Sequence, residues 1–199
     1  MNEKKSDSLL KNILRLPQTV ISMRELLLLW GNRSTSTLYS RINYYVKKGY
    51  LTQIRRGLYT KNKTYDPLEV ASKLMTPSYI SFETVLVRAG IVFQYYDSIF
   101  SASYRTRTLI CDRQAYAYKR LKYSLLTNTQ GIDVKDAYSI ATPERAFLDT
   151  VYLNKSYYFD NLAALDWKKV YQLLTLYENK RMEKSIQRYA THLKAKDHA

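Results

Sequence analysis

Residues 34–60 have the sequence STSTLYSRINYYVKKGYLTQIRRGLYT. A polar, basic helix is predicted to end at Lys47-Lys48-Gly49 and to lead directly into a short hairpin between Tyr50 and Tyr59. Upstream, residues 9–16 and 23–30 carry apolar side chains at helical spacing. Three helices and a hairpin therefore fit within about the first sixty residues.

The outward face of the helix after Ser34 has an unusual composition. Leu38, Ile42, Tyr45 and Val46 recur at the spacing of a buried helical stripe, so they are predicted to point inward. The side chains left outside are hydroxyls, an amide and cations, which can bond both phosphate oxygens and base edges in a major groove. If Ser34 or Thr35 is the N-cap, the first backbone N–H groups also face a phosphate. This pattern predicts a DNA-binding winged helix-turn-helix.

The hairpin adds two cations to this surface. Arg55 and Arg56 lie at its tip, where they would reach the flanking backbone or the minor groove, and Gly57 permits the tight turn. We predict groove contacts from Ser36, Ser40, Arg41, Asn43 and Tyr44, with Thr37 on the same face, and phosphate contacts from Arg33, Lys47, Lys48, Arg55 and Arg56.

The charge distribution supports this interpretation. Residues 33–63 contain eight Lys and Arg and no Asp or Glu, and residues 1–63 carry a net charge of +10 against +5 for residues 64–199. An ordinary solvated helix would leave this lack of acidic residues unexplained. A winged helix that binds protein is the second alternative, and a polybasic membrane patch is less favoured because the cations follow a patterned helix and hairpin.

The overall composition predicts a folded protein without a cofactor. Hydrophobic residues make up 46% of the 199 residues, enough for a sizeable core. The N-terminus is polar, and the longest apolar run, residues 26–30, is too short to cross a bilayer, so we expect a cytoplasmic protein with no membrane partner. Cys111 is the single cysteine and both histidines, His192 and His198, lie near the C-terminus, so no zinc site is expected.

Residues 64–199 read as a mixed domain in which prolines mark the starts of elements. Asp66-Pro67 and Thr142-Pro143 each predict an N-cap followed by proline at the first helical position, and Ser81 is predicted to cap a helix that ends at Gly90. Strands are predicted over 99–105, 106–112, 115–123 and 137–141, and two helices after residue 166. The expected fold class is α+β: a winged helix-turn-helix over 1–63, then a mixed α/β domain over 64–199 with a small sheet and C-terminal helices.

Tyrosines alternate with cations between residues 95 and 138. Aromatic and cationic side chains together can hold single-stranded RNA, which makes a candidate RNA or partner surface of Arg105, Arg107, Lys119, Arg120 and Lys122. The alternative is a half-buried sheet with its polar face in water, because strands favour aromatic residues. We favour this alternative.

Catalytic patterns are weak, and no catalytic residue is predicted. The five glycines are isolated, no histidine lies in the body of the chain, and Cys111 reads as a buried strand residue. Helix electrostatics accounts for Glu144, Arg145 and Asp149, because the first lies in a first helical turn and the other two are an i, i+4 pair. Asp112, Asp133 and Asp136 would bind a metal only if the fold gathered them. We expect a protein that is not an enzyme.

Four segments together resemble the AbiEi family of antitoxins. They are GYLTQIRRGLY at 49–59, Asp66-Pro67 with Val70-Ala71, PSYISFETVL at 77–86 with Gly90, and ATPERAFLD at 141–149. The resemblance covers about residues 20–160. It implies an N-terminal winged helix that represses its own operon by binding inverted repeats in promoter DNA.

The same resemblance implies a C-terminal domain that counteracts a nucleotidyltransferase-like toxin without forming a stable complex, as in type IV toxin–antitoxin systems. We expect a monomer or a weak dimer. The alternatives are a stand-alone transcription regulator and an RNA- or protein-interaction module. The chain is shorter after the Pro143 helix than the longer members of that family.

Overall fold

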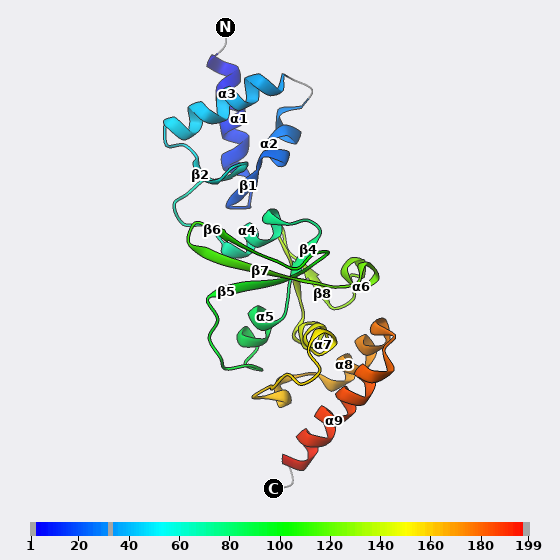
Figure 1. Cartoon of the computed structure of the whole chain (residues 1–199). Coiled ribbons are helices and arrows are strands. Elements are labelled where there is room, and N and C mark those ends of the chain that lie inside the picture. Colours follow the sequence, from blue (N-terminus) through cyan, green and yellow to red (C-terminus); the bar gives the residue numbers. More distant parts are fainter. Residues whose placement is uncertain (1–2, 32–33, 197–199) are drawn as a thin grey trace.

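The computed structural model describes residues 3–31 and 34–196 (Figure 1). Its N-terminal unit consists of α1 (Glu3–Arg15), β1 (Val20–Ser22), α2 (Met23–Trp30), α3 (Thr35–Lys47), β2 (Thr52–Arg55) and β3 (Leu58–Thr60). β3 pairs antiparallel with both β1 and β2. The predicted helices and hairpin are confirmed. β1 was not predicted, because three residues are too few to show a period.

Local signals and one small core define the three helices. α2 begins with a capping box, in which Ser22 and Glu25 satisfy each other's backbone N–H groups, and it ends at Gly31. Leu38, Ile42 and Tyr45 of α3 are buried as predicted, and Val46 packs partly against them. They meet apolar residues from the other elements of the unit, namely Leu9, Ile13, Ile21, Leu26, Trp30, Leu51 and Tyr59.

The rest of the described chain is built around a six-stranded mixed sheet. Its strands are β4 (Ser78–Ile80), β5 (Ser98–Ser103), β6 (Arg107–Cys111), β7 (Gln114–Arg120), β8 (Ile132–Val134) and β9 (Ser139–Ala141), in the order β6-β7-β5-β4-β9-β8. The pairs β5–β7 and β4–β9 are parallel and the other pairs antiparallel. The helices are α4 (Pro67–Leu74), α5 (Glu83–Arg88), α6 (Tyr123–Thr127), α7 (Pro143–Leu153), α8 (Trp167–Leu174) and α9 (Lys180–Lys196), with short 3₁₀ helices at Leu162–Ala164 and Thr175–Tyr177.

The expected α+β class is confirmed, with differences in detail. Asp66 and Thr142 cap α4 and α7 as predicted. Four of the six strands lie where the sequence placed them, whereas β4, β8 and α6 were not predicted. The prediction that Ser81 caps α5 is wrong: Phe82 holds the N-cap position at φ 55°, and the buried Ser81 hydroxyl donates to the Asp149 carboxylate.

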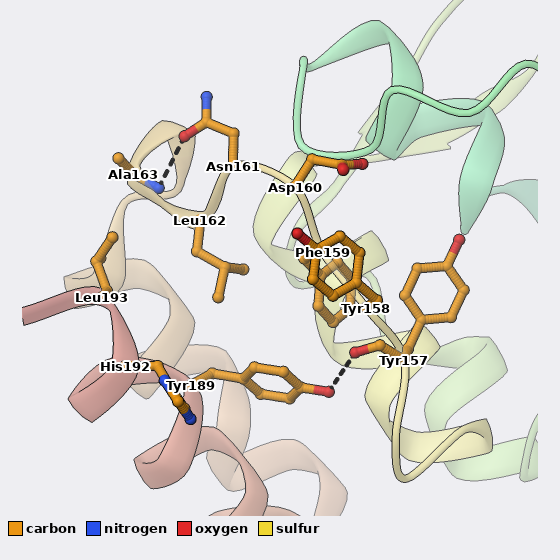
Figure 2. Close-up of a pocket in the computed structure, with 10 residues that line it drawn as sticks. All are labelled: Tyr157, Tyr158, Phe159, Asp160, Asn161, Leu162, Ala163, Tyr189, His192 and Leu193. Atoms are coloured by element: carbon orange, nitrogen blue, oxygen red, sulfur yellow. Dashed lines mark hydrogen bonds between the residues drawn. The ribbon is translucent and has the colours of Figure 1, made fainter. Parts of the chain in front are cut away.

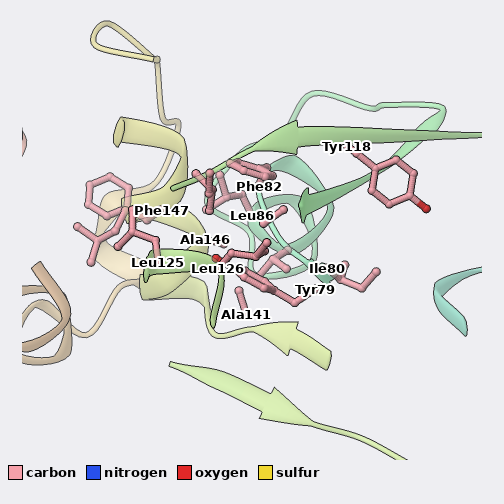
Figure 3. Packing of buried hydrophobic residues seen from close by; sticks show 14 of the residues in the cluster. Tyr79, Ile80, Phe82, Leu86, Tyr118, Leu125, Leu126, Ala141, Ala146 and Phe147 are labelled. Atoms are coloured by element: carbon pink, nitrogen blue, oxygen red, sulfur yellow. The ribbon is translucent and has the colours of Figure 1, made fainter. Parts of the chain in front are cut away.

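The larger core lies on both faces of the six-stranded sheet. Figure 1 shows α4 on the face toward the N-terminal unit and α5 and α7 on the opposite face. Phe147 of α7 is fully buried and packs edge-on against Phe159, and Figure 3 shows Phe82 and Leu86 among the buried residues of the same cluster. This packing buries α7 on nearly every side, since eight of its eleven residues are buried.

The two parts of the molecule are joined by packing and by hydrogen bonds. Val20 and Leu58 belong to the larger core although they come from the small sheet. The buried carboxylate of Glu69, on α4, accepts hydrogen bonds from the backbone N–H groups of Thr19 at 2.8 Å and Val20 at 2.7 Å. Lys73 of α4 forms an ion pair with Glu25 of α2. The N-terminal unit is therefore fixed against α4.

Candidate nucleic-acid interface

The outward face of α3 is polar and open to solvent. Of the residues predicted to contact DNA from this helix, Arg41 is half-buried and the others are exposed, namely Ser36, Thr37, Ser40, Asn43, Tyr44 and Lys47, with Lys48 exposed at the C-cap. Arg33 lies outside the described residues. Figure 1 shows α3 on the side of the N-terminal unit that faces away from the larger sheet, so no other described element covers this face.

The Ser34 side chain leaves the first backbone N–H groups of α3 uncapped. Ser34 occupies the N-cap position, but its side chain does not cap the helix: its hydroxyl lies 2.8 Å from that of Ser36. The Ser34 carbonyl accepts from the indole N–H of Trp30 at 3.2 Å, which fixes the start of the helix. Uncapped N–H groups at a helix start favour a phosphate oxygen.

Five cations predicted to contact DNA lack an acidic partner among the described residues. In the described part of the chain, Arg41, Lys47, Lys48, Arg55 and Arg56 form no ion pair with a carboxylate. The ammonium of Lys48 lies 5.9 Å from the centre of the half-exposed Tyr44 ring. A surface of unpaired cations and hydroxyls, without an acidic neighbour, has the electrostatic character of a phosphate-binding face.

The hairpin lies between α3 and the larger sheet (Figure 1). Arg55 and Arg56 are exposed at its tip, and Gly57 has φ +79° with its carbonyl accepting from Met23 N–H at 2.8 Å. Ile54 packs against the larger core, and the Cys111 thiol points to its carbonyl at 3.8 Å. The β2–β3 hairpin thus contacts the β6–β7 hairpin. This contact could not be predicted from the sequence, because it depends on how the N-terminal unit packs against the larger sheet.

The cations of the larger sheet fall into two groups. Lys119 is not free to contact a partner, because it forms an ion pair with the buried Glu83 at 2.7 Å and lies over the rings of Phe82 and Phe100. Tyr116 and Tyr118 are buried, as the sheet interpretation predicted. The other four cations of the candidate RNA or partner surface are exposed: Arg105, Arg107, Arg120 and Lys122.

Arg145 and Asp149 lie at the centre of the larger part and make a closed network. The Asp149 carboxylate accepts from Arg145 Nε at 3.3 Å and from the hydroxyls of Tyr79, Ser81 and Tyr177 at 2.6–2.8 Å. The Arg145 guanidinium also donates to the carbonyls of Gln130 and Leu125. Burial, with the charge of Asp149, raises the pKa of Tyr79 and Tyr177, so both hydroxyls stay protonated donors.

This network corrects the explanation from helix electrostatics. Arg145 and Asp149 are the predicted i, i+4 pair, but both side chains are fully buried rather than on a helix surface. Glu144 is buried too, and its carboxylate accepts from the backbone N–H of Asp166 at 3.3 Å. Because the two carboxylates and most donors of the Arg145 guanidinium are bonded within the protein, these three residues help to hold the fold together.

Metal and thiol chemistry find no support at the described residues. Across residues 3–31 and 34–196, no group of three or more His, Cys, Asp or Glu side chains is placed to hold a metal ion. Cys111 is buried on β6, as predicted, and burial raises the pKa of its thiol despite the nearby charge of Arg55. A thiol that is kept protonated is a poor nucleophile.

A cavity of about 560 Å³ opens between residues 157–163 and α9. Figure 2 shows Leu162, Phe159 and Tyr189 around it, with His192 and Leu193 on the α9 side. Tyr189 donates to the Tyr157 carbonyl at 2.7 Å, and the Asp160 carboxylate accepts from Phe93 N–H. The polar groups of the lining are thus partly used in joining loops, and the cavity offers mainly apolar surface.

No family model matches the chain, and no curated protein is significantly similar to it in sequence. Within the described residues, none of the helices has both the length and the apolar character needed to cross a bilayer.

Proposed function

We propose that the N-terminal unit is a winged helix-turn-helix that binds promoter DNA, and that the chain is an autoregulating antitoxin of the AbiEi kind. One observation carries the DNA-binding part: the exposed face of α3 presents hydroxyls, an amide and cations, and no carboxylate pairs with those cations among the described residues. Such a face is suited to phosphates and base edges at once.

The order of elements supports the winged-helix assignment. A helix and a short strand precede two further helices, and the last of these leads into an antiparallel hairpin that pairs with the first strand. In this arrangement α3 is the recognition helix and β2–β3 is the wing. α1 and α2 hold α3 by its buried stripe, so its polar face stays available to a major groove.

The antitoxin assignment is supported by where the resembling segments lie. Tyr79 and Ser81, from the segment 77–86, bond to Asp149 from the segment 141–149. The residues of two separate segments therefore share one buried network at the centre of the larger part. A common network is a physical reason for both segments to occur together in proteins of one fold, which favours a C-terminal antitoxin domain of that kind.

A mobility-shift titration on the DNA upstream of the gene tests the promoter-binding function. The protein is titrated on this duplex and on a scrambled duplex of equal length, at two salt concentrations. We expect preferential binding to the native duplex that weakens steeply as salt rises. Equal affinity for both duplexes would exclude a sequence-specific autoregulator, and absence of binding would exclude the DNA interface altogether.

The toxin partner separates an antitoxin from a stand-alone regulator. We expect a nucleotidyltransferase-like gene directly after this one, and co-expression of the chain should restore growth of cells that express that toxin. Promoter binding without such rescue would leave a transcription regulator alone. Rescue without a stable complex on co-purification is the result expected for a type IV system.

A further inference from the structure

Four cations gather at one end of the six-stranded sheet. β5 and β7 are parallel and end side by side, with Ser103 opposite Arg120. β6 begins at the same end, and the backbone N–H of Arg120 donates to the Thr106 hydroxyl at 3.2 Å. The segments 104–107 and 120–123 are therefore neighbours. We call their exposed side chains the sheet-end patch: Tyr104, Arg105, Arg107, Arg120, Lys122 and Tyr123.

This patch carries positive charge without local compensation. Between Asp97 and Asp133 the sequence has only one acidic residue, Asp112. Asp112 lies at the β6–β7 turn, at the other end of both strands, where it accepts from the Tyr65 hydroxyl. None of the four cations forms an ion pair with a described carboxylate. A concentrated, unpaired positive surface attracts a polyanion.

Exposed aromatic rings accompany these cations. Tyr123 is 72% exposed and Tyr104 is 40% exposed, whereas Tyr116 and Tyr118 on the adjoining strand are buried. The Arg105 guanidinium lies 5.4 Å from the centre of the Tyr104 ring. The two exposed tyrosines are not part of the hydrophobic core. Each is adjacent to a cation in the sequence.

We propose that the sheet-end patch binds single-stranded nucleic acid. The cations would hold phosphates while Tyr104 and Tyr123 stack on bases. A single strand fits better than a duplex because unpaired bases expose their faces to aromatic side chains, whereas a duplex keeps them within the stack. This inference does not depend on promoter binding by α3, which uses another element at the far side of the N-terminal unit.

The test is fluorescence anisotropy with labelled strands of about 12 nucleotides, a length within the range that one such site covers. The probes are a uridine RNA, a thymidine DNA and an abasic strand of equal length, each at two salt concentrations. We expect the full-length protein to bind both base-containing strands and to bind the abasic strand at least about fivefold more weakly. The ratio of the affinities for the RNA and the DNA strand then shows which of the two nucleic acids the patch prefers.

Matched variants locate the binding. Tyr123→Ala should weaken binding at least about fivefold, whereas Tyr158→Ala, which removes a ring of similar exposure (74%), should not. Arg107→Gln with Lys122→Gln should reduce the salt dependence, and Lys168→Gln with Lys184→Gln, an equal charge change at exposed positions elsewhere, should leave it unchanged. All these side chains are exposed, and circular dichroism checks that each variant is folded.

Four results would overturn this proposal. They are a lack of binding to any single strand, equal affinity for the abasic strand, equal weakening in the Tyr158 control, and an equal weakening of promoter duplex binding in the Tyr123 variant. The last result would place the patch within the duplex interface. Failure on duplex DNA with retained single-strand binding would instead remove the promoter function and leave this one intact.

Discussion

At the scale of single residues, Asp149 is a carboxylate held in the interior of the protein. Its carboxylate is fully buried and is compensated by one guanidinium and three hydroxyls. A buried carboxylate is tolerated only when such donors replace the water that it loses. The donors come from β4, from the loop that follows it, from α7 and from the 3₁₀ helix at Thr175–Tyr177, so one side chain ties together distant parts of the chain.

We expect Asp149→Asn to destabilise the protein by about 3–5 kcal/mol, the usual cost of removing one partner of a buried ion pair. The guanidinium of Arg145 would stay buried without its counter-charge, and an amide cannot accept from all the hydroxyls. Urea unfolding, followed by circular dichroism, measures the change.

Lys169→Ala is the control, because it removes the exposed ion pair with Asp166 and should leave stability unchanged. Similar stability of Asp149→Asn and the wild type would show that the carboxylate is neutral or that the network is dispensable.

At the scale of elements, the sequence predicted correctly those helices that have a full apolar period or a proline at their first position. Prediction failed for segments whose backbone conformation depends on partners far away in the sequence. α3 was predictable because Leu38, Ile42 and Tyr45 repeat at helical spacing. β1 is a strand only because it pairs with β3, which follows some forty residues later. Ser81 resembled an N-cap, but its hydroxyl is used by Asp149 from α7.

The candidate site was predicted to a similar extent. The exposed face of α3 follows directly from its buried stripe, so Ser36, Ser40 and Asn43 could be assigned from the sequence alone. Lys119 could not be distinguished from its neighbours, because its partner Glu83 lies 36 residues away on another element. The burial of Arg145 and Asp149 could not be predicted for the same reason, because the side chains around them come from elements far away in the sequence.

The ion pair between α2 and α4 gives a pH-dependent stability. Burial raises the pKa of Glu25, but hydrogen bonds from Lys73 and Ser22 outweigh it and hold the pKa below its ordinary value of 4.5. A carboxylate whose pKa is lower in the folded state stabilises the protein above its ordinary pKa, and this contribution is lost as the pH falls through the folded value.

Glu25→Gln should therefore reduce the free energy of unfolding at neutral pH by up to about 1 kcal/mol, as is usual for a pair that is not fully buried. The difference from the wild type should shrink below pH 4.5 and then vanish. The amide oxygen can still accept from Ser22, which keeps the cap. Urea titrations of both proteins across this pH range make the measurement, and Lys73→Gln should behave in the same way. A difference that persists at the lowest pH would assign the destabilisation to packing instead of charge.

At the scale of the whole molecule, the candidate surfaces lie on different elements of a connected frame. Figure 1 shows the N-terminal unit at one end, the six-stranded sheet in the middle and α9 at the other end. Glu69 and the core residues Val20 and Leu58 join the N-terminal unit to the sheet. Because α3 faces away from the sheet, DNA bound there would leave the larger part open to other partners.

On the proposed function, the β2–β3 hairpin and α3 should contribute differently to DNA affinity, and salt dependence separates the two contributions. Replacing Arg55 and Arg56 by alanine removes two exposed cations, so the plot of log affinity against log salt should become less steep by about 0.9 for each phosphate that the protein no longer neutralises, or about 1.8 for both arginines. Binding to the native duplex and to the scrambled duplex should weaken by the same factor in this variant.

Asn43→Ala should leave the slope unchanged. It should instead lower the ratio of the affinity for the native duplex to that for the scrambled duplex, because the Asn43 amide would contact base edges. Titrations of both variants on both duplexes at several salt concentrations measure the slope and the affinity ratio. An unchanged slope in the arginine variant would show that the hairpin serves only to dock the N-terminal unit on the larger sheet through Ile54.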